Sequence, residues 1–279
     1  MGGRTLTWVV MLVKITLARL LEYLSSSSHE SDTVPNTTII WSKKQHIARI
    51  TLNRPEVGNA INRQMAREME DVCREIGGDD DVYVVVITAA GEGAFCTGSE
   101  PEDAGYGVAA AVAGLEQPVI AAIDGDALGA GLELALSCDI RLSSRNAKFG
   151  LPQVTRGVIP MEGGTQRLPR IVGKGKALEM VFTGEAVGAE EALEIGLVSK
   201  VVSPEELPVE VEALAENLAG KAPIALRYAK EAVSKGLDLT LDQGLHLEAD
   251  LYFLLHTTDD RTEGIRAFLE KRSPHFKGQ

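Results

Sequence analysis

The chain has 279 residues, 44% of them hydrophobic, which is enough for a large core in one or two domains. Its formal net charge is −12 and its basic residues form no block, which argues against a nucleic-acid partner. Cys73, Cys96 and Cys138 stand far apart without paired spacing, and the five histidines include no metal-type pair. We therefore expect a reducing compartment, with neither a disulfide framework nor a metal site.

The first 36 residues differ in composition from the rest. Residues 5–13 are apolar, but the run is too short to span a bilayer and Lys14 interrupts it, so we expect no stable membrane insertion. As far as Ser28, Arg4, Lys14 and Arg19 stand against one acid, Glu22, as in a targeting presequence, although no small-residue cleavage site follows. A disordered or mis-started extension fits equally well. We therefore expect a cytoplasmic protein, or a mitochondrial matrix protein if residues 1–36 are a presequence.

From Thr38 onward, strand and helix patterns alternate. Asn62 predicts the N-cap of a helix that runs to Ile76 with its apolar residues on one stripe. The run over residues 82–88 is apolar and largely β-branched, as in a strand buried on both faces. Other strands are predicted at residues 38–41, 47–52, 118–123, 139–142 and 197–202. The alternation predicts an α/β fold with largely parallel pairing over residues 37–204.

Beyond Pro204 the chain has only helical patterns. Helices are predicted at residues 205–219, 222–235, 239–255 and 260–271. We expect residues 205–279 to form a helical C-terminal part that covers the core or contacts a neighbouring subunit.

Two glycine-rich turns follow predicted strands at their carboxyl ends. Residues 91–100 follow the strand at 82–88, and residues 125–131 follow the strand at 118–123. Open α/β sheets bind ligands at this edge. A helix that begins near Leu132 would direct its free N–H groups toward the same space. Two converging backbone donors would form an oxyanion hole, although glycines here can equally be simple tight turns.

Other glycine motifs are incomplete. Residues 129–131 lack the third glycine of a dinucleotide fingerprint, and residues 173–176 lack the hydroxyl residue and spacing of a phosphate loop. There is no G-x-S-x-G nucleophile elbow in the sequence.

A series of short blocks occurs in order along the chain, at residues 53–55, 59–60, 94–98, 118–122, 127–133, 138–140, 149–150, 159–160, 163–169 and 258–272. These blocks resemble the crotonase superfamily, the enoyl-CoA hydratases and isomerases, from Thr38 to Lys277. The resemblance implies a crotonase-like ββα superhelix with a helical C-terminal trimerisation region, and a homotrimer or hexamer. It also implies acyl-CoA substrates of the kind used in fatty acid β-oxidation, with coenzyme A part of the substrate and no separate cofactor.

The resemblance implies roles for single residues. The two N–H groups that bind the thioester oxygen as it becomes an enolate fall on Ser99 and Ala130, where alanine replaces the usual glycine. Hydratases hold a water between two glutamates, of which the first falls on Glu133 and the second on Gln153. An amide can hold a water but cannot exchange its proton near pH 7. Hydration should therefore slow by about 10²–10⁴-fold unless another group substitutes.

Glu162 is the nearest candidate in sequence for that second carboxylate. It lies at a predicted helix N-terminus, which favours a carboxylate, although a helix-start acid that faces solvent fits the same pattern. For Glu133 the alternative is a charged residue on an exposed helix. Because Leu132 and residues 134–136 are all apolar, we expect Glu133 to be buried.

The resemblance also implies contacts with coenzyme A and the acyl group. The loop at 53–59 and Thr97 would border the nucleotide end, although Glu56 stands where a lysine is common and puts one phosphate contact in doubt. Lys271 would supply a cation for a phosphate of a neighbouring subunit's ligand, or is simply a solvated lysine. Residues 100–115, rich in Ala and Gly, would shape the acyl pocket. The complete set of implied substrate contacts is Glu56, Val57, Asn59, Thr97, Gly98, Gly129, Tyr252, Phe268 and Lys271.

Hydration of a 2-enoyl-CoA is the leading expectation, with Glu133, Gln153 and Glu162 positioning the water. A double-bond isomerase needs a single base, and Gln153 favours that alternative on chemical grounds. A hydrolase or ring-modifying enzyme that acts on a CoA ester is a further alternative. The last is a non-catalytic CoA-binding or assembly subunit, against which the intact Glu133 argues.

Overall fold

The structure is a computed structural model that describes residues 37–100 and 107–279. These residues belong to one unit, Asn36–Gln279. The predictions for the N-terminal extension, and for residues 101–106 of the acyl pocket, fall outside the described residues.

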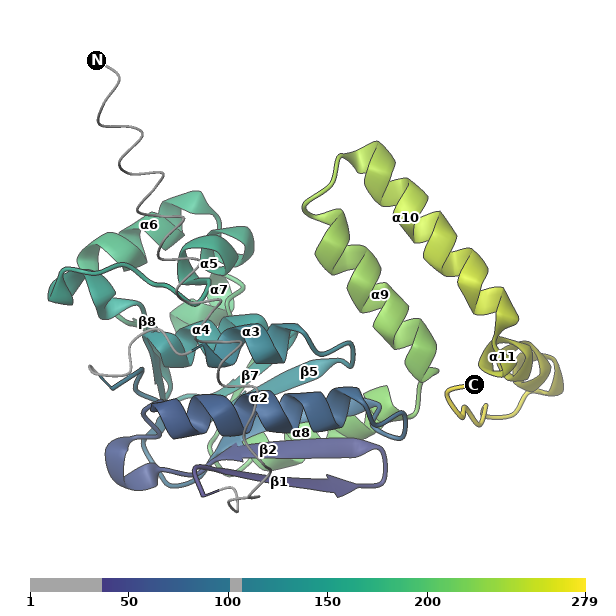
Figure 1. The fold of residues 1–279 in the computed structure, drawn as a ribbon, viewed down its shortest axis with the longest axis horizontal. Coiled ribbons are helices and arrows are strands. Elements are labelled where there is room, and N and C mark those ends of the chain that lie inside the picture. The colour runs from purple at the N-terminus through teal and green to yellow at the C-terminus, as the bar shows by residue number, and fades with distance from the viewer. Residues whose placement is uncertain (1–36, 101–106) are drawn as a thin grey trace, which may run out of the picture. The chain divides into compact units, whose positions relative to one another are not determined.

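A six-stranded sheet lies at the centre of this unit (Figure 1). β1 and β2 form an antiparallel hairpin with Ile39 opposite Leu52, and every other neighbouring pair is parallel. The predicted α/β class and largely parallel pairing are therefore confirmed. In spatial order the strands are β1 (Ile39–Lys44), β2 (Ile47–Leu52), β3 (Val84–Ala89), β5 (Val119–Ile123), β7 (Ile140–Ser144) and β10 (Lys200–Val202).

A second, four-stranded sheet was not predicted from the sequence. Its strands are β4 (Ala94–Cys96), β6 (Asp126–Leu128), β8 (Lys148–Gly150) and β9 (Val187–Gly188). β4, β6 and β8 follow β3, β5 and β7 along the chain, and each pair precedes a helix, so the ββα unit recurs as the resemblance implied. Two of these strands lie inside the glycine-rich turns, where runs of three residues are too short to show a strand pattern.

The helices of the core follow the strand pairs. Asn62 caps α2 as predicted, since its Oδ1 accepts a 2.9 Å hydrogen bond from the Met65 N–H. α4 begins two residues before the predicted Leu132, because the Gly129 carbonyl already accepts the first helical hydrogen bond, from the Glu133 N–H. The helical segments are η1 (Pro55–Val57), α2 (Arg63–Gly77), α3 (Val108–Ala113), α4 (Ala130–Ser137), η3 (Pro152–Arg156), α5 (Gly164–Val172), α6 (Lys174–Thr183) and α7 (Ala189–Glu194).

The central sheet is buried on both faces, as the β-branched run predicted. Val85 and Ile87 of β3 face the larger hydrophobic cluster, which includes α2, α4 and Phe95 of β4. Val84 and Val86 face the opposite cluster, which α8 (Leu207–Ala219) covers. The core therefore holds the carboxyl ends of β4 and β6, and the start of α4, in fixed places.

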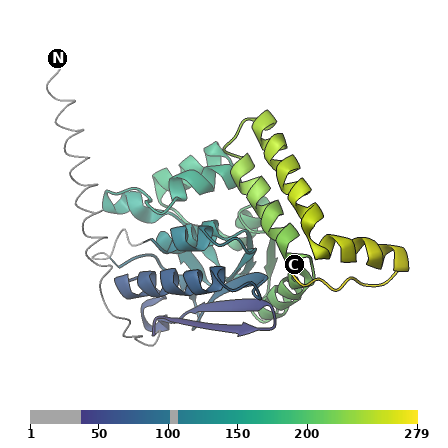
Figure 2. The ribbon, with the colours of Figure 1, turned by 45° about the vertical axis from the view of Figure 1, so that its right-hand side comes forward.

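Three more helices end the chain: α9 (Pro223–Gly236), α10 (Leu241–Leu254) and α11 (Asp259–Glu270), with the short η4 (Leu255–Thr257) before α11. α9 and α10 form an antiparallel hairpin (Figure 2). Thr240 caps α10 in a capping box with Gln243. No helix among the described residues is long and apolar enough to cross a bilayer.

Candidate active site

Glu133 is buried in the first turn of α4, with 2% of its surface exposed, as its apolar neighbours predicted. Its Oε1 accepts hydrogen bonds from two backbone N–H groups, those of Glu162 at 2.7 Å and Gly164 at 2.8 Å. Its Oε2 accepts a 3.1 Å bond from the Gln153 side-chain amide. One carboxylate oxygen is therefore fully held by the turn before α5, and the other faces a neutral amide.

The backbone around Ser99 and Ala130 has the features of an oxyanion hole. The Ile61 N–H donates to the Gly98 carbonyl, and the Ile61 carbonyl accepts from the Glu100 N–H. Because peptide directions alternate along an extended segment, the N–H of Ser99 points away from Ile61. Ala130 is the first residue of α4, where N–H groups have no intrahelical acceptor. Gly98 has φ +113, and a Cβ there would lie 3.8 Å from the Ala130 nitrogen. A glycine at this position keeps the space between the two predicted donors open.

Gln153 lies in η3 beside Glu133, where the second hydratase glutamate was expected to fall. Its amide nitrogen donates to Glu133, and its Oε1 is buried without a hydrogen-bond partner among the described residues. Because buried polar atoms are normally paired, this oxygen is suited to accept a hydrogen bond from a water or a substrate hydroxyl. Gln153 can hold such a group in place but cannot move its proton.

Glu162 is half-buried and turns toward α3, not toward solvent. Its Oε2 accepts a 3.2 Å hydrogen bond from the Ala109 N–H, and its own N–H holds Glu133. The alternative of a helix-start acid that faces solvent is therefore wrong. Glu162 therefore links the start of α3 to the turn that holds Glu133. α3 lies in the segment 100–115 that was predicted to shape the acyl pocket, of which residues 100 and 107–115 are described.

Burial makes both carboxyl groups weaker acids than usual. Burial raises the pKa of Glu133, and this is partly offset by the N–H groups of Gly164 and Glu162 and by the charge of Arg167. Burial also raises the pKa of Glu162, to about 7; the Ala109 N–H opposes the rise, and the negative charge of Glu133 adds to it. At neutral pH Glu162 is therefore present in both its acid and its carboxylate form.

The predicted loop contacts at residues 53–59 lie beside Thr97. A 3.0 Å hydrogen bond runs from the Thr97 N–H to the Gly58 carbonyl, and Glu56 and Val57 are exposed on η1. Asn59 is 1% exposed and bonds Arg54, Ala90 and Ala94 through its side chain. The Asn59 side chain therefore braces this loop from within, which differs from the direct substrate contact that we predicted.

Three of the predicted substrate contacts lie far along the chain from Glu133. Tyr252 is on α10, Phe268 is on α11, and Lys271 ends α11 in a left-handed conformation. All three are exposed, and in Figure 1 α10 and α11 lie on the far side of α9 from α4 and α5. Within one chain the structure does not bring these residues to the site, in keeping with the expectation that they would serve a neighbouring subunit.

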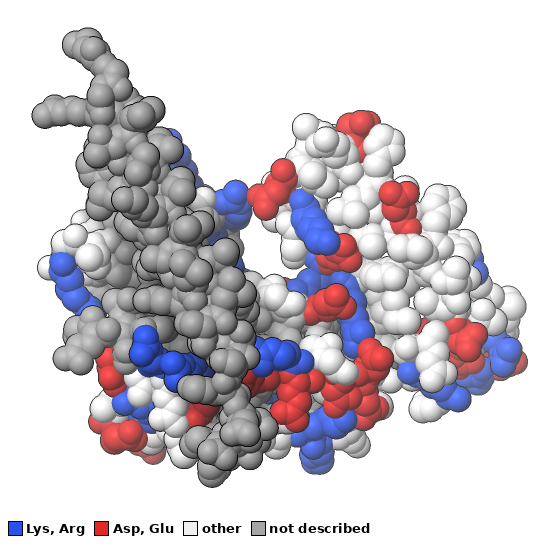
Figure 3. Space-filling model, in the orientation of Figure 1, with Lys and Arg blue, Asp and Glu red and all other residues white. Residues whose placement is uncertain are grey.

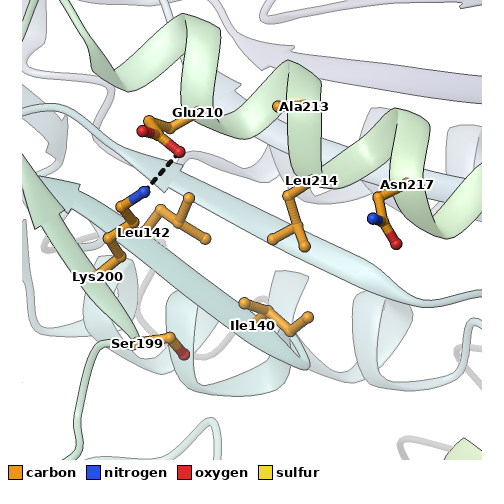
Figure 4. A pocket seen from close by; sticks show the side chains of 8 residues that line it. All are labelled: Ile140, Leu142, Ser199, Lys200, Glu210, Ala213, Leu214 and Asn217. Atoms are coloured by element: carbon orange, nitrogen blue, oxygen red, sulfur yellow. Dashed lines mark ion pairs between the residues drawn. The ribbon is translucent and has the colours of Figure 1, made fainter.

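A separate cavity of about 510 Å³ lies between α8 and the central sheet (Figure 4). Ile140, Leu142 and Leu214 line it, and the ion pair between Lys200 and Glu210 borders it at 2.6 Å. None of the predicted site residues contributes to this cavity. The described residues also include no group of three or more His, Cys, Asp or Glu that could hold a metal ion.

Arg167 is a site residue to which the sequence reasoning gave no role. Its Nη1 donates a 2.8 Å hydrogen bond to the Glu162 carbonyl. Its position one helical turn after Gly163 was a usable signal, because helical side chains lean toward the N-terminus of their helix. Ala109 was also missed, and no local signal could have revealed it, since it lies 53 residues from Glu162.

The repeated ββα units, the two glycine loops and the buried glutamate of α4 define a protein of the crotonase type. The enoyl-CoA hydratase/isomerase family matches residues 42–279. A crotonyl-CoA hydratase from Syntrophomonas wolfei is 40% identical over 252 residues, which cover 85% of this chain and 97% of that protein. A short-chain-enoyl-CoA hydratase from Clostridium acetobutylicum is 40% identical over 248 residues, 84% of this chain and 95% of that protein.

The fold has solved counterparts. The crystal structure of an enoyl-CoA hydratase from Bacillus anthracis is similar to this structure, with a TM-score of 0.83 and 40% sequence identity. The match covers 87% of this chain and 100% of the Bacillus anthracis chain. The chain therefore belongs to the enoyl-CoA hydratase/isomerase family, and the predicted crotonase-like fold is confirmed.

Proposed function

We propose that this protein is an enoyl-CoA hydratase, which adds water across the 2,3 double bond of a 2-enoyl-CoA thioester. The observation that carries the proposal is the geometry of α4. Its first residue, Ala130, offers an N–H beside Gly98 and Ser99, and three residues later its buried Glu133 is fixed by the Glu162–Gly164 turn. One rigid element therefore carries both an oxyanion donor and a carboxylate.

In the proposed reaction, the water oxygen bonds to C3 as Glu133 takes a proton from the water. The π electrons of C2=C3 shift toward C1, and the thioester oxygen becomes an enolate oxygen held by the N–H groups of Ser99 and Ala130. The enolate collapses as C2 takes a proton from the carboxylic acid of Glu162. A proton passes from Glu133 to Glu162 through solvent, and this restores the starting state.

The division of roles follows from the surroundings of each group. Gln153 supplies an acceptor that can hold the attacking water, because its Oε1 has no hydrogen-bond partner among the described residues. Glu162, with its pKa of about 7, is suited to give and regain a proton near neutral pH. Proton transfer of this kind needs no cofactor beyond the coenzyme A of the substrate.

A double-bond isomerase is the second candidate, and Gln153 is the observation that favours it. A single carboxylate can remove a proton from C2 of a 3-enoyl-CoA and return it at C4, so Glu133 alone would suffice. Hydrolysis of a CoA ester is a related possibility, in which the same oxyanion hole would stabilise the oxyanion formed when water attacks the thioester carbonyl.

Incubation of the purified protein with crotonyl-CoA and, separately, with a 3-enoyl-CoA distinguishes these candidates. We expect crotonyl-CoA to give 3-hydroxybutyryl-CoA, measured as loss of the conjugated-thioester absorbance. If crotonyl-CoA remains unchanged while the 3-enoyl substrate is converted to a 2-enoyl-CoA, the protein is an isomerase. If neither substrate changes while coenzyme A still binds, the non-catalytic alternative holds.

We also propose that the C-terminal helices join copies of this chain into a trimer or hexamer in the cytoplasm. The described part of α10 and α11 exposes many large apolar side chains, among them Leu241, Tyr252, Phe253 and Phe268. The surface over α10 is largely uncharged in Figure 3. Contiguous apolar surface of this kind is typical of an interface. A neighbouring copy is also the arrangement in which Tyr252, Phe268 and Lys271 could reach a substrate.

A further inference from the structure

The turn before α5 contains three consecutive peptide groups, and the first and third of them donate hydrogen bonds to Glu133. The Glu162 N–H and the Gly164 N–H both donate to Glu133 Oε1. The peptide between them contains the Glu162 carbonyl, which accepts the 2.8 Å hydrogen bond from Arg167 Nη1. Each peptide is planar and is joined to the next only through the φ and ψ angles of one residue, so a hydrogen bond that anchors the central peptide limits how far the two flanking peptides can rotate.

The guanidinium of Arg167 lies directly over Gly163. A Cβ at Gly163 would overlap Arg167 Nη1, and Gly163 has φ +105, which other residues rarely adopt. The Arg167 N–H also donates to the Gly163 carbonyl at 2.7 Å, so backbone and side chain hold the same turn. The positive φ favours glycine at this position, and a side chain there would also displace the guanidinium of Arg167 from the turn.

We propose that Arg167 is a positioning residue, which holds the central peptide of this turn so that both flanking N–H groups point at Glu133. The proposal rests on the proposed function in that Glu133 is taken as the base. The side chain of Arg167 bonds the Glu162 carbonyl, and in this role it acts through the turn and not on the substrate directly. It thereby fixes which oxygen of Glu133 is occupied and leaves Oε2 to face Gln153.

The charge of Arg167 has a second consequence. It lowers the pKa of both Glu133 and Glu162, against the effect of burial. Loss of this cation should therefore make both carboxyl groups weaker acids, whereas loss of a purely structural residue would leave their ionisation unchanged.

Arg167→Gln is the direct test, with Arg170→Gln as a matched control. Arg170 lies in the same helix but is paired with Asp238 and the Gln166 carbonyl, away from the turn. In Arg167→Gln we expect kcat for hydration to fall roughly 10²-fold, as for a misplaced catalytic group, with KM little changed. We also expect its pH–rate profile to move to higher pH. Arg167→Lys, which keeps the charge, should restore the pH profile but not the full kcat.

A second measurement does not depend on turnover. Titration of glutamate carboxyl carbons by ¹³C NMR, with Glu133→Gln to assign the signal, should show that Glu133 ionises at higher pH in Arg167→Gln than in wild type or in Arg170→Gln. An unchanged titration with unchanged kcat would overturn the role of Arg167. A shifted titration in a protein that hydrates no enoyl-CoA would instead overturn the proposed function and leave the positioning role supported. Arg167→Lys serves both measurements if Arg167→Gln does not fold.

Discussion

Three side chains carry the proposed chemistry, and the sequence predicted them unequally well. Burial of Glu133 followed from its apolar neighbours, and the structure confirms it. The closeness of Gln153 to Glu133 came only from the family resemblance, because the two lie on different elements 20 residues apart. The setting of Glu162 could not be predicted at all, since it depends on where the start of α3 lies in space.

The first prediction concerns the pH dependence of hydration. If Glu162 donates a proton to C2, it must be protonated, so the rate should fall as pH rises through about 7, its pKa in the folded protein. In Glu162→Gln this alkaline limb should disappear, and the rate at pH 6 should fall by about 10²–10⁴-fold. Stopped-flow or steady-state hydration of crotonyl-CoA between pH 5 and 9 measures both. A profile with the same alkaline limb in Glu162→Gln would remove Glu162 from the mechanism.

A second prediction concerns Gln153→Glu. This change places a second carboxylate against Glu133 Oε2, where like charges oppose ionisation. Since Glu162 already supplies a proton, we expect hydration of crotonyl-CoA at pH 7 to rise by less than about tenfold. A gain of several hundredfold would mean that the native site lacks a second acid, and would favour the isomerase.

At the scale of elements, the long strands and helices were predictable and the short ones were not. The six strands of the central sheet and the four C-terminal helices lie within three residues of their predicted bounds, because each spans enough residues to show its periodicity. β4, β6 and β8 have three residues each and lie beside glycines, so their pairing is determined by the packing of neighbouring repeats. The second sheet became visible only in three dimensions.

A buried carboxylate of α2, that of Glu68, bonds the start of β1 and the residues just before it. Glu68 accepts hydrogen bonds from the backbone N–H groups of Thr37, Thr38 and Ile39 and from the Thr38 hydroxyl. Burial alone would raise the pKa of Glu68, but the hydrogen bonds from Thr38, Gln64 and Thr37 outweigh it, so the pKa lies below its ordinary value. The charged form is therefore the one that the fold stabilises.

From this follows a third prediction, on stability. Glu68→Gln should lower the free energy of unfolding at pH 7 by about 1–3 kcal/mol, because an amide cannot accept from all of these donors. The contribution of Glu68 should be complete at neutral pH and be lost as pH falls through its lowered pKa, in the range below 4.5. Urea unfolding of both proteins at pH 7 and pH 4 tests this. Glu70→Gln, on the exposed face of the same helix, is the control and should change little. Equal stability of Glu68→Gln and wild type at pH 7 would contradict the assignment.

At the scale of the whole molecule, the described chain accounts for the core of the site but leaves several implied contacts elsewhere. Tyr252, Phe268 and Lys271 lie on helices whose large apolar residues are exposed. The sequence predicted these helices, and the family resemblance implied their use between subunits; contacts of that kind would involve a second chain and cannot follow from local patterns.

The fourth prediction tests that assembly. A charge at Leu241 or Phe253, which are 80% and 66% exposed in the single chain, should be costly if another copy covers them. We expect wild type to sediment as a trimer or hexamer, and Leu241→Glu and Phe253→Glu to dissociate. Val209→Glu, at a 69% exposed position on α8, is the control. A monomeric wild-type protein would overturn the proposed assembly.

The donors predicted to hold the thioester oxygen are backbone N–H groups, whereas the groups proposed to hold the water and to move protons are side chains on three separate segments: α4, η3 and the turn before α5. A point mutation can exchange a side chain without moving the peptide donors. Binding of the thioester oxygen and transfer of protons can therefore change independently in proteins with this fold. A new reaction requires only that an acidic side chain be gained or lost at one of these segments, while the oxyanion hole stays unchanged. In the proposed mechanism, the glutamine at 153 and the glutamate at 162 correspond to such a relocation.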